Sequence, residues 1–295
     1  MKNISVLIPV KNEEQNIRAC LESVKWADEI FVVDSHSTDK TVEIAREYTD
    51  KIVLFDYVPG GPKKKNWSLE HLPFANEWVL ILDADERIPP ELRDEIREVI
   101  ERDEADGYYM NRRFIFLGRW IKHCGWYPSW NLRLFKYRLG RYESLGTSDV
   151  QDVGDNEVHE HVILKGRIGY LKHDIIHDDQ KTLSDWLEKH NRYSTWDARV
   201  YYNFLHDGKK WGLKMLFSRD AVRRKRAMKR LFVRFPFRPF FRFLWMYFLK
   251  FGFLDGKQGF IFCMLMSMHE FAISAKLWDL ENTGIIEQQI ETKEM

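Results

Sequence analysis

The first hundred residues alternate between short apolar runs and more polar segments. Apolar, β-branched runs occupy residues 4–10, 29–35, 51–57 and 77–82, as in strands that are buried on both faces. The segments between them, 13–26, 37–48 and 60–72, are expected to be helices, and in the first of these Ile17, Cys20, Leu21 and Val24 recur at helical spacing. Strands and helices that alternate at this interval predict a parallel, three-layer α/β sheet.

Polar side chains follow the ends of these predicted strands. In parallel α/β sheets, ligands bind beyond the carboxyl ends of the strands. The residues expected at that edge are Pro9, Asn12, Glu13, Asp34, Ser35, Asp39, Lys63, Lys64, Lys65, Asn66, Asp83 and Asp85. The sequence therefore predicts a ligand crevice at this edge of the sheet.

The fourth apolar run ends in Asp83-Ala84-Asp85. Two carboxylates two positions apart on an extended chain point to the same side, and Mg²⁺ or Mn²⁺ takes such oxygen ligands together with substrate phosphates and water. The chain has neither G-x-G-x-x-G after its first strand nor G-x-x-x-x-G-K-[ST], which argues against a Rossmann or P-loop nucleotide site. The motif predicts a diphosphate held through a divalent cation; the alternative is a strand that simply ends in an acidic turn.

Composition places few further limits on function. A chain of 295 residues suits one large domain, or one domain with an appendage. The formal net charge of +1 gives no general attraction to nucleic acid. Three cysteines without metal-binding spacing suit a reducing cytosol. The first apolar run is too short for a signal-peptide core, so we expect the protein to stay in the cytoplasm.

Residues 206–295 differ in character from the rest of the chain. Ten basic residues and one acid, Asp220, lie between Arg219 and Arg242, and a stretch rich in Phe, Trp, Tyr and Met follows. Lys250, Asp255 and Lys257 interrupt that stretch before it reaches the roughly 20 apolar residues of a spanning helix. We therefore expect amphipathic helices that lie on an anionic membrane surface.

Three other interpretations of this region remain open. It could be a soluble helical subdomain that packs its apolar face on the preceding domain, or a pair of membrane helices broken at residues 255–259. A patch for single-stranded nucleic acid also combines cations with aromatic residues, but the neutral overall charge and the first half of the chain do not favour it.

Three motifs resemble glycosyltransferase family 2, whose members have the GT-A fold. They are SVLIPVKNEEQNI, VVDSHSTDKT and EWVLILDADE, in that order, within a match that covers roughly the first 140 residues. The segments YPSWNLRLFKY (127–137), NEVHEH (156–161) and AKLWDLE (275–281) resemble the bacterial lipopolysaccharide-core β-1,4-glucosyltransferase branch.

That resemblance implies an inverting transferase that uses Mg²⁺ or Mn²⁺. It would move one sugar, glucose from UDP-glucose, to a lipid-linked or lipopolysaccharide-core acceptor at the cytoplasmic face of the membrane. The Q-x-x-R-W signature of processive members is replaced by HNRYSTW (190–196), which favours a single addition. A sugar-nucleotide pyrophosphorylase is an alternative, but PVKNEEQN lacks the glycine-rich loop of those enzymes; a non-catalytic, membrane-tethered sugar-binding protein is another.

The resemblance also implies roles for individual residues. Pro9 and Glu13 would line the uridine pocket, and Asp34 would hydrogen-bond the uracil or ribose. Lys65 and Asn66 would lie near the nucleotide, and Arg133 would face the diphosphate. Asp83 would lie near the ribose and the metal, and Asp85 would ligate the metal. These residues fall in an expected GT-A domain, 1–205, with a nucleotide half (1–110) and an acceptor half (111–205).

Inverting transfer needs a base within hydrogen-bond reach of the acceptor hydroxyl. The best cluster is NEVHEHVIL (156–164), in which we assign Glu160 as the base, and His161 or His159 as a contact to metal or diphosphate. Asp149, Asp152 and Glu157 remain alternatives for the base, and the whole cluster could instead be an exposed hairpin. A zinc site is disfavoured, because no third ligand follows at standard spacing.

Overall fold

The computed structural model describes residues 2–58, 61–143, 161–207 and 221–283, and for residues 221–226 it describes the backbone only. The chain folds as two compact units, residues 1–181 and 182–295, which we call the N-terminal and the C-terminal unit. The expected boundary after residue 205 falls at the end of α5 (Leu183–Leu205), which packs against α8 (Gly256–Asn282). The compact units therefore divide before α5, and a division of roles at residue 205 stays a prediction.

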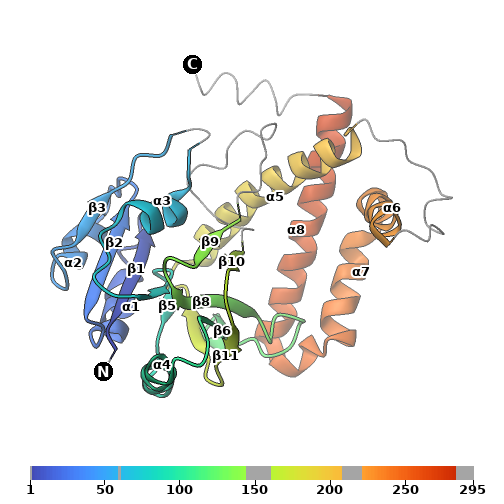
Figure 1. Ribbon diagram of the computed structural model, residues 1–295. Helices are drawn as coiled ribbons and strands as arrows, with labels where there is room; N and C mark the ends of the chain where they lie inside the picture. The colour runs from blue at the N-terminus through green and yellow to red at the C-terminus, as the bar shows by residue number, and fades with distance from the viewer. Residues whose placement is uncertain (1, 59–60, 144–160, 208–220, 284–295) are drawn as a thin grey trace. The chain divides into compact units, whose positions relative to one another are not determined.

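The first half of the N-terminal unit is a parallel sheet in the order β3-β2-β1-β4 (Figure 1). Its elements are β1 (Ile4–Val10), α1 (Ile17–Val24), β2 (Glu29–Asp34), α2 (Thr41–Ala45), β3 (Ile52–Leu54), α3 (Lys64–His71) and β4 (Trp78–Ile81). The pairs β1–β2, β2–β3 and β1–β4 are all parallel, which confirms the prediction for these strands. The sequences of these strands are largely continuous apolar runs because both faces of the sheet are buried.

The second half extends the same sheet with antiparallel and parallel pairs, so the complete sheet is mixed. Its elements are β5 (Glu86–Arg87), α4 (Pro90–Arg102), β6 (Gly107–Phe116), β7 (Arg119–Trp120), β8 (Trp130–Lys136), β9 (Gly140–Tyr142), β10 (Val162–Leu164), β11 (Ile168–Tyr170) and β12 (Ile175–Asp178). The order continues from β4 through β8, β6 and β12 to β5, with β8 antiparallel to both β4 and β6. Strand β12 lies antiparallel to β5 and places His177 opposite Glu86. Strands β9 and β10 form a separate two-stranded sheet.

The core of this unit has two parts, one on each face of the sheet. Alternate side chains of β1 pack into the two parts. Val6 and Ile8 belong to the cluster that includes residues of α1 and α4, and Leu7 belongs to the cluster that includes residues of α3. Successive side chains of a strand point to opposite faces, so one seven-residue run contributes to both. This two-sided packing fixes the strand ends, and with them the edge that carries the polar side chains.

The C-terminal unit is helical. It consists of α5, α6 (Ala221–Arg234), α7 (Arg238–Leu244), the π-helical turn η2 (Trp245–Leu249), the 3₁₀ turn η3 (Gly252–Asp255) and α8. A capping box between Thr182 and Asp185 starts α5. By length and hydropathy, Gly252–Asn282 is the one segment among the described residues that could cross a membrane. The break in the apolar stretch falls at η2 and η3, and the DGKQG sequence leads directly into α8.

Candidate active site

The turn after β4 presents the acidic side chains that end this strand. Leu82 is still paired with β1, through its N–H to the carbonyl of Leu7, 3.0 Å away. Asp83 and Glu86 then close the turn, because the N–H of Glu86 donates to the carbonyl of Asp83 and the N–H of Asp83 donates to the Glu86 carboxylate, both at 2.9 Å. Asp85 lies within this fixed turn, so its position is set by the backbone and not by a flexible loop.

Asp83 is bound by two cations. The Arg133 guanidinium contacts one carboxylate oxygen and the Lys65 ammonium lies 3.0 Å from the other. Burial acts to raise the pKa of Asp83, but the charges of Arg133 and Lys65 outweigh it and hold that pKa well below its usual range. Arg133 also lies 3.1 Å from the Glu86 carboxylate, which is fully buried. Asp83 is therefore an ionised carboxylate whose charge is already balanced by the protein.

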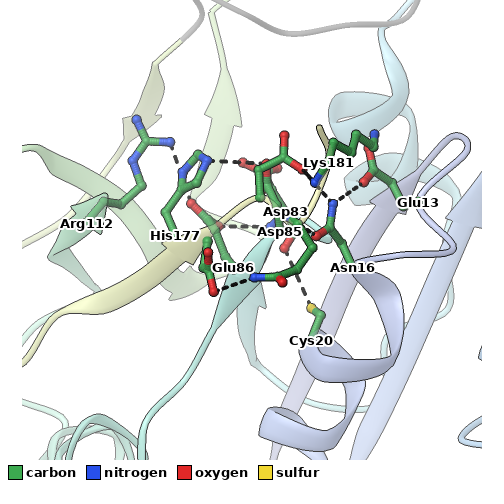
Figure 2. A network of polar contacts seen from close by, with 12 residues as sticks. Glu13, Asn16, Cys20, Asp83, Asp85, Glu86, Arg112, His177 and Lys181 are labelled. Carbon is green, nitrogen blue, oxygen red and sulfur yellow. Dashed lines mark hydrogen bonds and ion pairs between the residues drawn. The ribbon is translucent and has the colours of Figure 1, made fainter. Parts of the chain in front are cut away.

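Asp85 has different surroundings. Its carboxylate faces the imidazole of His177, with Nε2 3.3 Å from Oδ2 (Figure 2). Burial acts to lower the pKa of His177, and the carboxylates of Asp85 and Glu86 outweigh it, so the pKa is raised. The backbone supports the pair, because the N–H of Asp178 donates to the carbonyl of Asp85 at 2.9 Å.

The histidine beside Asp85 is thus His177, which the sequence analysis did not single out. His161, the expected ligand, directly precedes β10; its carbonyl accepts from the N–H of Glu143, and the residue is exposed. A signal for His177 was present in DIIHDD (174–179), an apolar pair followed at once by polar residues, as after β4. Glu160, with His159, Asp149, Asp152 and Glu157, lies outside the described residues.

Glu13 lies beside this pair, in the loop between β1 and α1. The ammonium of Lys181 is 2.6 Å from its carboxylate, and the buried amide of Asn16 donates to it at 2.8 Å (Figure 2). Asn16 also donates to Asp179 at 2.9 Å and accepts from the N–H of Gln180 at 2.9 Å. Burial raises the pKa of Glu13, although Lys181 and Asn16 oppose the shift. Asn16 thereby ties the end of β1 to the segment that follows β12.

The remaining expected donor-site residues lie at the ends of β1, β2 and α3. Asp34 is buried and accepts from the N–H of Ser37 at 2.9 Å; in the sheet register it is opposite Val10, next to Pro9. Lys64 donates to the carbonyl of Val10 at 2.8 Å, which brings the start of α3 to the same edge.

The two lysines at the start of α3, Lys64 and Lys65, are both buried. Asn66 holds the backbone of Tyr142, donating to its carbonyl and accepting from its N–H, both at 2.9 Å. The ring of Tyr142 in turn lies 5.3 Å from the Lys65 ammonium. The contacts of Asn66 therefore position β9 beside α3, and its expected place near a nucleotide stays a prediction.

The polar groups suit a cation that is shared with a ligand. Within the described ranges no group of three or more His, Cys, Asp or Glu side chains could enclose a metal ion. Asp85 and His177 supply an oxygen and a nitrogen donor side by side. Mg²⁺ is commonly bound by one or two carboxylates with substrate phosphate and water, and a neutral imidazole is a common metal ligand. The pair therefore fits a divalent cation that arrives with a diphosphate.

Comparison with known proteins identifies the family. Residues 5–153 match the family model described as "Glycosyl transferase family 2". Since the match spans half of the chain, the protein belongs to glycosyltransferase family 2, and the resemblance drawn from its motifs is confirmed.

Relatives over nearly the full length are also glycosyltransferases. The lipopolysaccharide core biosynthesis glycosyltransferase LpsC of Rhizobium meliloti is 28% identical over 93% of this chain and 92% of its own length. An uncharacterized glycosyltransferase of Rickettsia typhi is 27% identical over 95% of this chain and 88% of its own length. Among solved structures, S. aureus TarS 1–349 in complex with UDP-GlcNAc is 16% identical over 95% of this chain and 92% of that chain, with a TM-score of 0.43.

Proposed function

We propose that this protein is an inverting, metal-dependent glycosyltransferase that moves a single glucose from UDP-glucose to a lipid-linked or lipopolysaccharide-core acceptor. The observation that carries the proposal is the pairing of Asp85 with His177 at the carboxyl edge of the sheet, beside Glu13 and Asp83, in a family 2 chain. The acceptor class is supported by the similarity to LpsC along nearly the full length of both proteins.

In this proposal Asp85 and His177 hold Mg²⁺ or Mn²⁺, with His177 in the role first expected of His161. The cation would neutralise negative charge on the diphosphate leaving group. Arg133 and Lys65 keep Asp83 ionised and fixed in position, so that its carboxylate can accept hydrogen bonds from the donor nucleotide. Pro9, Glu13 and Asp34 lie where the uridine would bind, at the ends of β1 and β2.

Glu160 is the proposed base, and its replacement by glutamine separates binding from transfer. Glu160→Gln should bind UDP-glucose as the wild type does, because the amide has nearly the same shape as the carboxylate. It should lower transfer by about 100- to 10,000-fold, the usual contribution of a positioned base. Single-turnover transfer rates and donor titrations check this. Wild-type rates in Glu160→Gln would move the assignment to Asp149, Asp152 or Glu157, whose glutamine or asparagine variants serve as matched controls.

The donor can be tested by thermal unfolding with a panel of nucleotide-sugars and Mn²⁺. A ligand present at about 100 times its Kd stabilises by about 2.7 kcal/mol, so UDP-glucose should raise the unfolding temperature by several degrees. The part of the shift that depends on Mn²⁺ should vanish in Asp85→Ala. A larger shift with a purine nucleotide-sugar would refute the uridine donor.

Measuring the released product distinguishes the rival functions. The proposed enzyme releases UDP when a glycolipid acceptor is supplied. A pyrophosphorylase-like enzyme would release pyrophosphate when supplied with UTP and sugar phosphate, and a sugar-binding protein would release neither. Family membership favours the first of these outcomes.

The proposed lipid-linked acceptor and the basic, aromatic C-terminal region together support association of the protein with the membrane. We propose that the protein acts as a peripheral protein on the cytoplasmic face, held by anionic lipid. The C-terminal unit would supply the surface for this contact.

A further inference from the structure

The C-terminal unit exposes many large apolar side chains between residues 235 and 271, and several of their rings contact one another. These are Phe235, Phe237, Phe240, Phe241, Trp245, Phe248, Leu249, Phe251, Phe253, Leu254, Phe260, Met264, Met268 and Phe271. In a soluble monomer, exposed apolar residues are usually scattered, and larger continuous patches mark binding surfaces. We call this set the apolar surface of the α7–α8 hairpin.

The hairpin is a built element of the fold. Helices α7 and α8 pack against each other, joined by η2 and η3 (Figure 1). At the turn, Gly259 approaches the carbonyl of Gly252 so closely that a Cβ on Gly259 would overlap it. The hydroxyl of Ser267 on α8 also donates to the carbonyl of Pro239 on α7, at 2.7 Å. The apolar side chains therefore project from a fixed scaffold.

Ionic groups of the same helices point inward. Arg238 is fully buried and lies 3.1 Å from the carboxylate of Glu270, and His269 lies 3.5 Å from that of Asp197 on α5. Lys276 is held by α5 through the hydroxyls of Ser194 and Thr195, at 2.7 and 2.8 Å.

Along α8, by contrast, Phe260, Met264, Met268 and Phe271 recur at steps of three or four and form one exposed stripe. Soluble proteins usually bury apolar side chains and expose charged ones. Here ion pairs are buried and apolar side chains are exposed, a distribution that suits contact with lipid.

The charged residues around the apolar surface are cationic. Between residues 221 and 257 the only acid is Asp255, which is buried. Arg242 and Lys250 lie over the ring of Trp245, at 5.8 and 5.1 Å from its centroid. Tryptophan and basic side chains together are typical of the headgroup region of a bilayer. The charge of this surface is therefore complementary to anionic phospholipid.

We propose that the apolar surface of the α7–α8 hairpin inserts into one leaflet of an anionic phospholipid bilayer and lies along it without crossing. This inference deepens the proposed function, since it names the surface that would hold the enzyme near a lipid-linked acceptor. Arg242 and Lys250 contact lipid phosphates, and the phenylalanines enter the boundary between headgroups and acyl chains.

Insertion into one leaflet fits the distribution of charge along α8 better than a span does. The segment Gly252–Asn282 is long and apolar enough to cross a membrane. Its second half, however, contains Glu270, Lys276, Asp279 and Glu281. Lys250 lies in the hairpin turn, and Lys257 lies in the first turn of α8. The stretch of α8 without charge, residues 258–268, is about 16 Å long at 1.5 Å per residue, roughly half of a bilayer core of about 30 Å.

The test uses the full-length protein and two matched double variants. Leu249→Glu with Phe253→Glu places two acids on the apolar surface, where both residues are exposed. Leu117→Glu with Ile168→Glu places two acids on exposed apolar positions of the N-terminal unit. Binding is measured by sedimentation with vesicles of phosphatidylcholine alone or mixed with phosphatidylglycerol. Bound protein is then washed with alkaline carbonate.

The wild type and the Leu117/Ile168 variant should bind the anionic vesicles and be released by carbonate. The Leu249/Phe253 variant should bind about 100-fold more weakly, because two apolar side chains no longer enter the leaflet. Equal binding of both double variants would overturn the proposal, and so would retention of the wild type after carbonate, which indicates a spanning helix.

Hydrolysis or transfer of the donor sugar in solution separates this inference from the proposed function. Both double variants should retain the wild-type rate with a water-soluble acceptor sugar, since neither change touches Asp85 or His177. Wild-type vesicle binding by a protein without any transferase activity would refute the function and leave the membrane surface in place.

Discussion

Replacement of Asp85 by alanine is expected to lower sugar transfer about 1,000-fold, because the loss removes the carboxylate that would hold the cation at the leaving diphosphate. The fold should be unaffected: the interaction of Asp85 with Asp178 uses the Asp85 carbonyl, which alanine retains. Transfer rates over a range of Mn²⁺ concentrations, with circular dichroism of the same samples, make the measurement. His177→Ala should need more Mn²⁺ to reach its maximal rate.

The matched control is Asp94→Ala, which removes an exposed carboxylate of the same unit that is paired with Arg93 on α4. It should transfer sugar at the wild-type rate. Near-normal activity of Asp85→Ala at every Mn²⁺ concentration would remove the assigned role of this carboxylate, whatever the donor proves to be.

Replacement of Arg133 by methionine is expected to destabilise the N-terminal unit by about 3 kcal/mol, since breaking a buried ion pair leaves charge without compensation. Arg133 is buried between Asp83 and Glu86, and methionine has a similar length but no charge. The value is at the lower end of the usual range because Lys65 still faces Asp83 and Arg112 still lies 3.6 Å from Glu86. Urea unfolding gives the free-energy difference.

Arg112→Met is the matched control for this change. Arg112 is more exposed than Arg133 and is more distant from Glu86, so its loss should cost less than about 1 kcal/mol. Equal unfolding free energies for the two variants would show that Arg133 does not hold the acidic turn together. The pKa of Asp83 should also rise in Arg133→Met, because the larger of its two favourable charge interactions is gone.

The first four strands could be predicted from sequence because burial on both faces leaves a simple signal. Strand β2 is buried at every position and is apolar between its terminal acids, Glu29 and Asp34, and its neighbours in the sheet lie close to it along the chain. The edge at which ligands bind then follows from the direction of the strands. The polar residues after β1, β2 and β4 could be assigned to that edge without any structure.

The rest of the sheet could not be predicted, because its pairs join segments far apart along the chain. Strand β12 pairs with β5 through Ile176 and Arg87, and neither strand shows in its own sequence which partner it will take. The proposed cation ligands depend on that pairing, since it brings His177 to Asp85. From residue spacing alone, His161 in NEVHEH (156–161) is the better candidate. Spacing along the chain does not show which distant strands pair, or in which register.

Sequence pattern also could not separate the two carboxylates of the D-x-D motif. Asp83 and Asp85 follow the same strand, yet Arg133 and Lys65 balance the charge of the first, whereas His177 faces the second. The partners come from β8, α3 and β12, three elements whose meeting point depends on the whole sheet. The motif therefore predicts a site, and the surrounding structure gives its two carboxylates different neighbours.

A crystal structure with UDP and Mn²⁺ bound tests the central claim most directly. The account predicts manganese in contact with the Asp85 carboxylate and with Nε2 of His177, and with the diphosphate of UDP as its third partner. Manganese and diphosphate bound elsewhere in the protein, with Asp85 and His177 still facing each other as they do now, would contradict it.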